Sequence, residues 1–223
     1  MVVLFLSICE VQMNQYSKSL TFLTITIFLL GTFPVLAHHP MGGKVPGNFF
    51  EGFISGLGHP IIGPDHFAFV ISVGLLAAVS HQGFKILIAF VLTAIAGTGL
   101  HLMEFNLPGA EFVISGSVLL FGILLALSER PNGWILTGLA AFIGLFHGYA
   151  YGESIVGAEM TPLIAYLLGF TLIQLIVAIV ASRIGRVVLK KAQEPSSLFL
   201  RFAGFIICGM GFAFLSTLLV ELL

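Results

Sequence analysis

Three ionisable side chains stand close together at the start of one long apolar stretch: His59, Asp65 and His66 in GHPIIGPDHFAFVISVGLLAA. Ionisable groups at membrane depth are costly, and those that occur usually serve a function. Imidazole nitrogens and carboxylate oxygens together suit divalent ions such as Ni²⁺, Co²⁺, Zn²⁺, Cu²⁺ or Fe²⁺. The stretch therefore predicts a transition-metal site where an apolar helix begins.

The spacing of the two histidines is compatible with one helical face. His66 follows His59 by seven residues, which is about 10 Å of rise along an α-helix, and positions seven apart return to nearly the same face. Pro64 suits the first turn of a helix, so a helix that starts at Gly63, with His59 on a preceding turn, is the alternative. In both arrangements Asp65 and His66 occupy the first turn of the apolar segment.

Two further apolar stretches end on ionisable residues. His101 and Glu104 are three positions apart near the end of one stretch, so they are neighbours on one helical face. His147 lies about 7 Å before the end of another stretch at the helical rise, and Glu153 follows it. Both pairs are expected at the same depth as the first three residues.

The predicted metal ligands come from four segments of the chain. They are His59, Asp65, His66, His147 and His101, with Glu104, Glu153, His38 and His39 as weaker candidates. Asp65 has two other roles open to it, because a carboxylate can orient a ligating histidine or cap a helix. The two cysteines, Cys9 and Cys208, are far apart in sequence, so no thiolate site is predicted.

These side chains must be positioned by membrane-spanning helices. The chain has 223 residues, of which 58% are apolar and 9% are charged, whereas a soluble domain carries about 25% charge. The predicted fold is all-α, a polytopic membrane bundle of six helices near the length of about 20 residues that crosses a bilayer, after a cleaved signal peptide. The predicted spans are 59–80, 84–103, 108–128, 134–152, 161–184 and 198–222, within a transmembrane domain of residues 59–223.

The segment 1–37 predicts a secretory signal peptide. A positively charged residue precedes the apolar stretch 20–30, and a small-residue cleavage site ends at Ala37. Met13 is an alternative start, and an uncleaved first membrane helix is the alternative interpretation. Residues 38–58 are then an outer N-terminal segment with a short helix, lying at the interface or packed against the bundle.

Charged residues divide between the two sides of the membrane. With six spans and a translocated N-terminus, Lys44 is the one basic residue of the mature chain that falls outside, and the others fall in inner loops, as the positive-inside rule requires. The inner basic residues are Lys85, Arg130, Arg183, Arg186, Lys190, Lys191 and Arg201, and the outer acidic residues are Glu51, Glu104, Glu111, Glu153, Glu159 and Glu221. Both mature termini are then outside, and the acidic outer face concentrates cations.

Two other features bear on packing and on energy source. Gly144, Gly148 and Gly152 recur at four-residue spacing, which predicts close packing of their helix against a neighbour. The sequence contains no GxxxxGK[ST] nucleotide-binding loop, so ATP hydrolysis by this chain is not expected. The formal net charge of −1 gives no indication of nucleic-acid binding.

The motifs around the histidines resemble those of the HupE/UreJ family of nickel permeases. The family's HPxxGxDH motif is intact at 59–66, and its second motif, roughly FHGxAHGxE, is matched in part by FHGYAYG at 146–152. Tyr151 stands where the family often has a second histidine. Ser154 stands where the family often has glutamate, with Glu153 one place earlier.

The resemblance covers essentially the whole chain and implies a transporter in the bacterial inner membrane, not an enzyme. Its cargo is then Ni²⁺, with Co²⁺ or Zn²⁺ as alternatives, for hydrogenase or urease maturation, and His59, Asp65 and His66 are critical for transport. The expected partners are the divalent metal ion, the lipid bilayer and, indirectly, the maturation proteins. Two alternatives stay open: a membrane-embedded zinc-dependent hydrolase, and an accessory subunit that captures metal without moving it.

Overall fold

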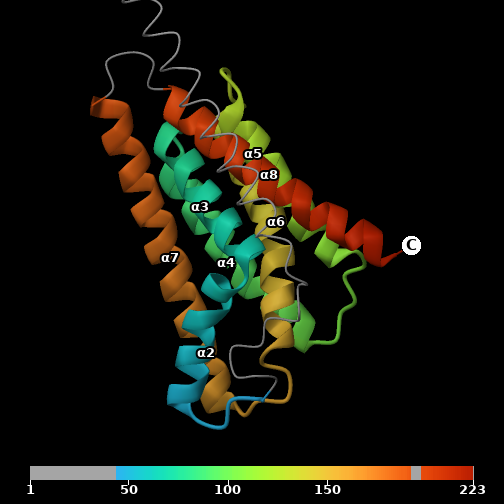
Figure 1. The fold of residues 1–223 in the computed structure, drawn as a ribbon. Coiled ribbons are helices and arrows are strands. Elements are labelled where there is room, and N and C mark those ends of the chain that lie inside the picture. Colours follow the sequence, from blue (N-terminus) through green and yellow to red (C-terminus); the bar gives the residue numbers. More distant parts are fainter. Residues whose placement is uncertain (1–43, 192–196, 223) are drawn as a thin grey trace, which may run out of the picture. The chain divides into compact units, whose positions relative to one another are not determined.

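Seven α-helices make up the regular secondary structure of the described part of the chain (Figure 1). The computed structural model describes residues 44–191 and 197–222. The helices are α2 (Phe49–Ile62), α3 (Pro64–Val79), α4 (Gly83–Leu102), α5 (Ala110–Ala126), α6 (Gly133–Glu153), α7 (Met160–Lys191) and α8 (Ser197–Glu221). The all-helical prediction is confirmed for these residues. The predicted signal peptide, His38 and His39 lie outside them.

Four helices are long and apolar enough to cross a membrane on their own: α4, α6, α7 and α8. α2 and α3 meet the same criterion as a pair, although they are bent by 79° at the break between them. α5 is shorter, at 17 residues. By length and composition the described residues contain four spans, or five if the bent pair is one span. The chain is thus a multi-pass membrane protein, and the count of six spans stays a prediction.

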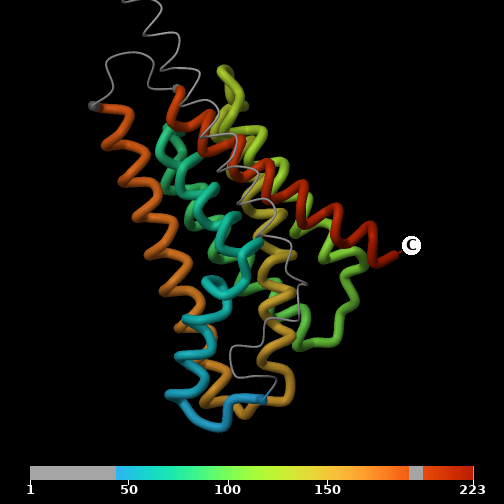
Figure 2. The backbone as a smooth tube through the Cα atoms, viewed as in Figure 1, coloured from blue at the N-terminus to red at the C-terminus, as the bar shows by residue number. Residues whose placement is uncertain are grey.

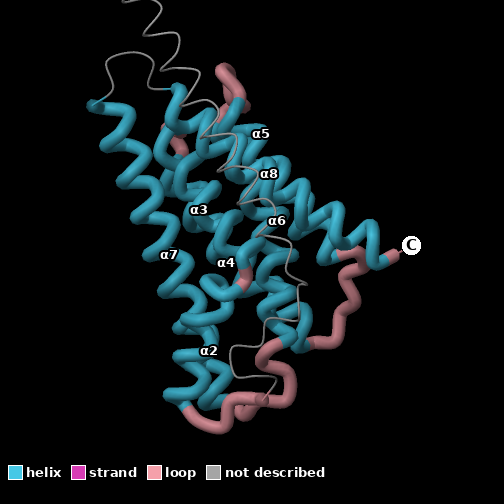
Figure 3. Tube along the Cα trace, in the orientation of Figure 1, coloured by secondary structure: helices cyan, strands magenta, loops and turns pink. Residues whose placement is uncertain are grey.

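The break between α2 and α3 differs from the predicted boundary (Figure 3). The spanning helix predicted at 59–80 begins only at Pro64, and the preceding short helix continues to Ile62. A residue before proline is pushed out of the α region, and Gly63 accordingly adopts φ −74° and ψ 106°. The predicted start at His59 is therefore wrong, and the alternative boundary at Gly63 is correct. His59 lies in the last turn of α2.

Small residues let neighbouring helices approach closely. α6 packs on α4 along the face of Gly144, Gly148 and Gly152, where a Cβ at Gly148 would overlap the carbonyl of Ala94. The close packing predicted for this face is confirmed. α2 runs beside α7 and α5 beside α8 (Figure 2), so the short helix α2 packs against the bundle.

An aromatic cluster joins the helices that surround the motif. Phe69 of α3 lies 5.5 Å from Phe90 of α4 and 4.8 Å from Phe121 of α5, measured between ring centroids. All three side chains are fully buried. Because Phe69 follows His66 by three residues, it lies on the same face of α3. Packing of this cluster therefore holds the histidine-bearing turn in a fixed orientation.

Candidate metal-binding pocket

The bend at Gly63 brings the two motif histidines together. His59 lies at the end of α2 and His66 in the first turn of α3, yet their ring centroids are only 5.6 Å apart. In a straight helix seven residues span about 10 Å. Each of the two residues is only 5% exposed. The kink therefore brings the two histidine rings of the motif together at a buried position.

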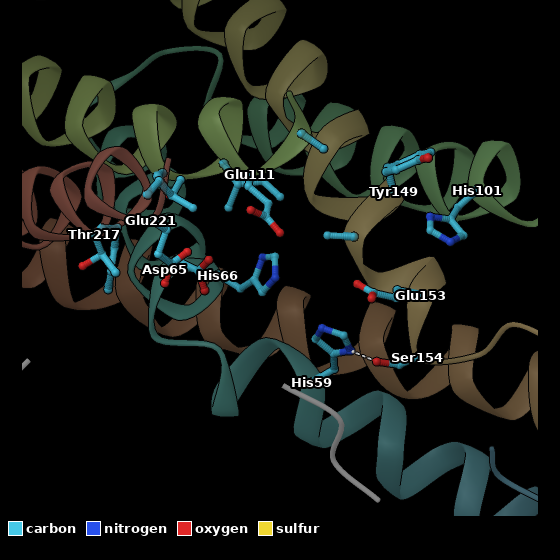
Figure 4. Close-up of a pocket in the computed structure, with 16 residues that line it drawn as sticks. His59, Asp65, His66, His101, Glu111, Tyr149, Glu153, Ser154, Thr217 and Glu221 are labelled. Carbon is cyan, nitrogen blue, oxygen red and sulfur yellow. Dashed lines mark hydrogen bonds between the residues drawn. The ribbon is translucent and has the colours of Figure 1, made fainter. Parts of the chain in front are cut away.

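Both histidines line one pocket, whose volume is about 280 Å³ (Figure 4). Its walls come from α2, α3, α4, α5, α6 and α8. The ionisable or hydroxyl-bearing residues that line it are His59, Asp65, His66, His101, Glu111, Ser115, Tyr149, Glu153, Ser154, Thr217 and Glu221. Three imidazoles and four carboxylates thus line one pocket, and carboxylates gathered around a pocket attract cations.

Two of these carboxylates were not predicted as ligands. Glu111 belongs to α5 and Glu221 to α8, and the sequence placed both only on an acidic outer face. They line the pocket because α5 packs along α8. Figure 4 shows Asp65, Thr217 and Glu221 at one end of the pocket and His101 at the other.

Two hydroxyl groups hold the His59 ring. Its Nδ1 lies 2.9 Å from Ser154 Oγ and 2.9 Å from Tyr166 Oη. The Tyr166 hydroxyl donates its only hydrogen to the carbonyl of Tyr151, at 2.8 Å, so it can only accept from His59. His59 Nδ1 therefore carries the hydrogen, and Nε2 of the neutral ring carries the lone pair that can ligate a metal.

A second histidine, His147, contacts the His66 ring. His66 Nδ1 lies 2.8 Å from Nδ1 of His147, and Nε2 of His147 lies 3.0 Å from Ser117 Oγ. The His147 ring stacks on Phe69, with centroids 4.1 Å apart and an interplanar angle of 14°. His147 is fully buried and is not among the residues that line the pocket. The sequence predicts His147 as a ligand together with His59 and His66. In the structure, however, His147 contacts His66 and does not line the pocket.

Asp65 sits at the N-terminus of α3. Its Oδ1 accepts a hydrogen bond from the backbone amide of His66, at 2.8 Å. A carboxylate in the first helical turn also interacts favourably with the helix dipole. The N-cap position itself is Gly63, without a side-chain cap. Asp65 lines the pocket as well, so its bond to the His66 amide and a role toward a cation are compatible.

His101 and Glu104 do not lie with the motif histidines. His101 packs on the ring of Tyr149, with centroids 4.5 Å apart, at the far end of the pocket. Glu104 does not line the pocket. It has φ 61° and ends α4 in a Schellman turn, because the amides of Phe105 and Glu104 bond the carbonyls of Leu100 and His101. Glu104 thus has a structural place at the helix end.

Five of the predicted ligands share a pocket, but they do not form one coordination sphere. Within residues 44–191 and 197–222, no three His, Cys, Asp or Glu side chains are grouped closely enough to hold a metal ion. Of the predicted set, His59, Asp65, His66, His101 and Glu153 line the pocket. A cation in this pocket would therefore be bound by few protein donors at a time.

Four polar residues that the metal-site prediction did not use hold the histidines in place. Ser154 and Tyr166 bond His59, and Ser117 bonds His147. Tyr151 is fully buried, with its ring centroid 5.0 Å from His59 and 4.7 Å from His66. Ser154 and Tyr151 are the two departures from the second family motif, so both departures lie against the motif histidines. The only sequence signal that could have identified Ser117 and Tyr166 is weak, because each is a hydroxyl-bearing residue in an apolar stretch.

Together, the fold and the pocket define a class of protein: a multi-pass helical membrane protein whose helices enclose imidazoles and carboxylates. The family can be stated more narrowly. The chain belongs to the HupE/UreJ family, because the family model described as "HupE / UreJ protein" matches residues 26–214. The resemblance inferred from the HPxxGxDH motif is therefore confirmed.

A curated relative agrees with this assignment. The chain is 30% identical to "Protein HupE" of Rhizobium leguminosarum bv. viciae over 162 residues, which cover 70% of this chain and 76% of that protein. No solved structure matches the chain.

Proposed function

We propose that the protein is a permease that carries a divalent transition-metal ion into the bacterial cytoplasm. Ni²⁺ is the first candidate cargo and Co²⁺ the second, and the metal would supply hydrogenase or urease maturation. Membership of the HupE/UreJ family supports this class of function, as does similarity to a protein named HupE.

One observation carries the proposal: a single pocket holds both motif histidines together with Asp65, Glu111, Glu153 and Glu221. The carboxylates would raise the local concentration of a hydrated cation. The two imidazoles would then replace hydration waters, since imidazole is a good ligand for Ni²⁺ and its neighbours in the transition series.

The absence of a closed cage among the described residues suits a transporter. A permeating ion must bind well enough to enter and weakly enough to leave. A structural or catalytic zinc site instead uses three or four protein ligands at fixed distances, and no group of three is present in the part of the chain that the structure describes. This favours transport over the zinc-hydrolase alternative.

Charge at the opposite end of the helices supports the proposed orientation. Lys85 and Trp134 lie in the first turns of α4 and α6, whose last turns reach the pocket through His101 and Glu153. Lys85 Nζ lies 4.0 Å from the centroid of the Trp134 ring. A basic end and an acidic pocket fit a pocket on the outer side, by the positive-inside rule.

A route inward from the pocket would pass Tyr151 and Gln174. Both side chains are fully buried. The side chains of Tyr151 and Gln174 interact, but neither the Tyr151 hydroxyl nor the Gln174 amide makes a hydrogen bond of good geometry with any described residue. Such groups are costly in a bilayer unless they are satisfied. We place the inner part of the path here, where water or the hydrated ion would satisfy them.

Purified protein in liposomes loaded with a metal-sensitive dye tests the proposal. We expect Ni²⁺ or Co²⁺ influx, its loss in His66→Ala and Asp65→Asn, and unchanged influx in His81→Ala, since His81 lies in the loop between α3 and α4 and outside the pocket. Tight metal binding without influx would overturn transport and favour the capturing subunit. Zinc-dependent cleavage of lipid esters or amides without influx would favour the hydrolase.

A further inference from the structure

A continuous hydrogen-bonded chain runs from α5 through α6 to α3. Ser117 Oγ donates to the carbonyl of Ile114, at 2.6 Å, and lies 3.0 Å from His147 Nε2. His147 Nδ1 lies 2.8 Å from His66 Nδ1. The exposed fractions of Ser117, His147 and His66 are 2%, 0% and 5%. Water therefore has little access to this chain of hydrogen bonds, and the three side chains bond to one another instead.

Counting hydrogens fixes the direction of each bond. A serine hydroxyl has one hydrogen, and the 2.6 Å contact with Ile114 uses it. Ser117 Oγ can then only accept, so Nε2 of neutral His147 carries a hydrogen and donates it. Nδ1 of His147 is left with a lone pair. The 2.8 Å nitrogen–nitrogen contact needs one hydrogen, which must come from Nδ1 of His66.

From this chain we infer that Ser117 is a positioning residue, which acts through His147 to hold His66 in the tautomer that presents Nε2 as the metal-binding nitrogen. The inference rests on the proposed function, in which His66 binds the cargo ion. It also changes the role of His147. Both nitrogens of His147 are used within the chain, so His147 orients a ligand and does not ligate.

Two features of the surroundings support a positioning role. Phe69 stacks flat on the His147 ring, which fixes the plane in which both nitrogens point. His59 reaches the same tautomer by a separate route, through the Tyr166 hydroxyl. The two motif histidines thus both carry hydrogen on Nδ1. Partners that fix the tautomer of a metal-ligating histidine typically affect metal affinity by about 10- to 100-fold.

The test compares three serine variants of the full-length protein. Ser117→Ala removes the acceptor for His147, and we expect Ni²⁺ affinity, measured by titration of the purified protein, to fall about 10- to 100-fold. Ser117→Thr keeps a hydroxyl and should restore most of the affinity. Ser72→Ala is the matched control, because Ser72 makes the same backbone bond, to Phe69 at 2.6 Å, but is not part of the chain to His66.

Nitrogen NMR of ¹⁵N-histidine-labelled protein reads the tautomer directly. The His66 signal, identified by its loss in His66→Ala, should show hydrogen on Nδ1 in the metal-free wild type. In Ser117→Ala it should shift toward the other tautomer, which a packing role alone would not cause. A wild-type His66 with hydrogen on Nε2, or unchanged tautomer and affinity in Ser117→Ala, would overturn the inference. If the wild-type protein transports Ni²⁺ but His66 carries its hydrogen on Nε2, only this inference fails. If the wild-type protein neither binds nor transports metal, the proposed function fails.

Discussion

The anchoring of His59 by two hydroxyl groups gives a quantitative prediction. Tyr166→Phe and Ser154→Ala each remove one of the two acceptors at 2.9 Å from His59 Nδ1. A single hydrogen bond contributes about 1 kcal/mol net, which is about fivefold in Kd when 1.4 kcal/mol is tenfold. Either acceptor alone still holds the Nδ1 hydrogen, so each single variant should weaken metal binding only by about that factor.

The double variant should weaken metal binding more than either single variant does. With both acceptors gone, the buried Nδ1 hydrogen has lost both hydroxyl partners, at a cost of about 1–3 kcal/mol, and the tautomer is no longer fixed. We expect the Kd for Ni²⁺ to rise by about 10- to 100-fold. Because the two hydroxyl groups share one partner, their effects are expected to be coupled and not simply additive.

Competition with a coloured chelator, on purified protein in detergent, measures these constants. Thr137→Val is the control, because it removes a hydroxyl from α6 that bonds the Gly133 carbonyl at 2.7 Å, at the end of the helix away from Ser154. The reasoning is refuted if the double variant binds Ni²⁺ within twofold of the wild type while remaining folded.

Three further predictions follow from the structure. Glu104→Gly should raise the free energy of unfolding by about 1 kcal/mol, because it removes a non-glycine residue from a left-handed backbone conformation. The same variant should leave uptake unchanged. A thermal melt checks the stability and a flux assay checks the uptake, and lost uptake would show that Glu104 has a role in transport. Lowering the outer pH through the range in which imidazoles become protonated should reduce uptake, because imidazole must be deprotonated to ligate a metal; steady uptake well below pH 6 in vesicles with a clamped proton gradient would contradict imidazole ligation. Gln174→Leu should lower flux by about tenfold, equivalent to one lost polar contact of about 1.4 kcal/mol, with the Kd of the outer pocket unchanged; equal flux would remove Gln174 from the path.

Much of the fold could be predicted because its signals are local. Apolar stretches of membrane length and the glycine and proline residues between them placed α4 to α8 within a few residues, apart from the long C-terminal end of α7. The boundary near His59 was ambiguous, since Pro60 and Pro64 are both compatible with a first helical turn. The structure shows that α2 tolerates Pro60 and that Pro64 begins α3.

The sequence could indicate which helix ends carry the ionisable residues, but not the rotation of each helix about its axis. His66, His101 and His147 were all expected at one level of the membrane. The packing angles of α4 and α6 turn His101 toward Tyr149 and His147 toward Ser117, and no sequence spacing within one helix carries that information. For the same reason the contributions of Glu111 and Glu221 to the pocket depend on how α5 meets α8.

The central claim is that His59 and His66 bind the same ion in one pocket. X-ray absorption spectroscopy of the Ni²⁺-loaded protein tests this claim directly, because outer-shell scattering counts imidazole ligands. We predict two imidazoles with oxygen donors in the wild type, and one in each of His59→Ala and His66→Ala. A spectrum with no imidazole, or one that is unchanged by both substitutions, would contradict the account.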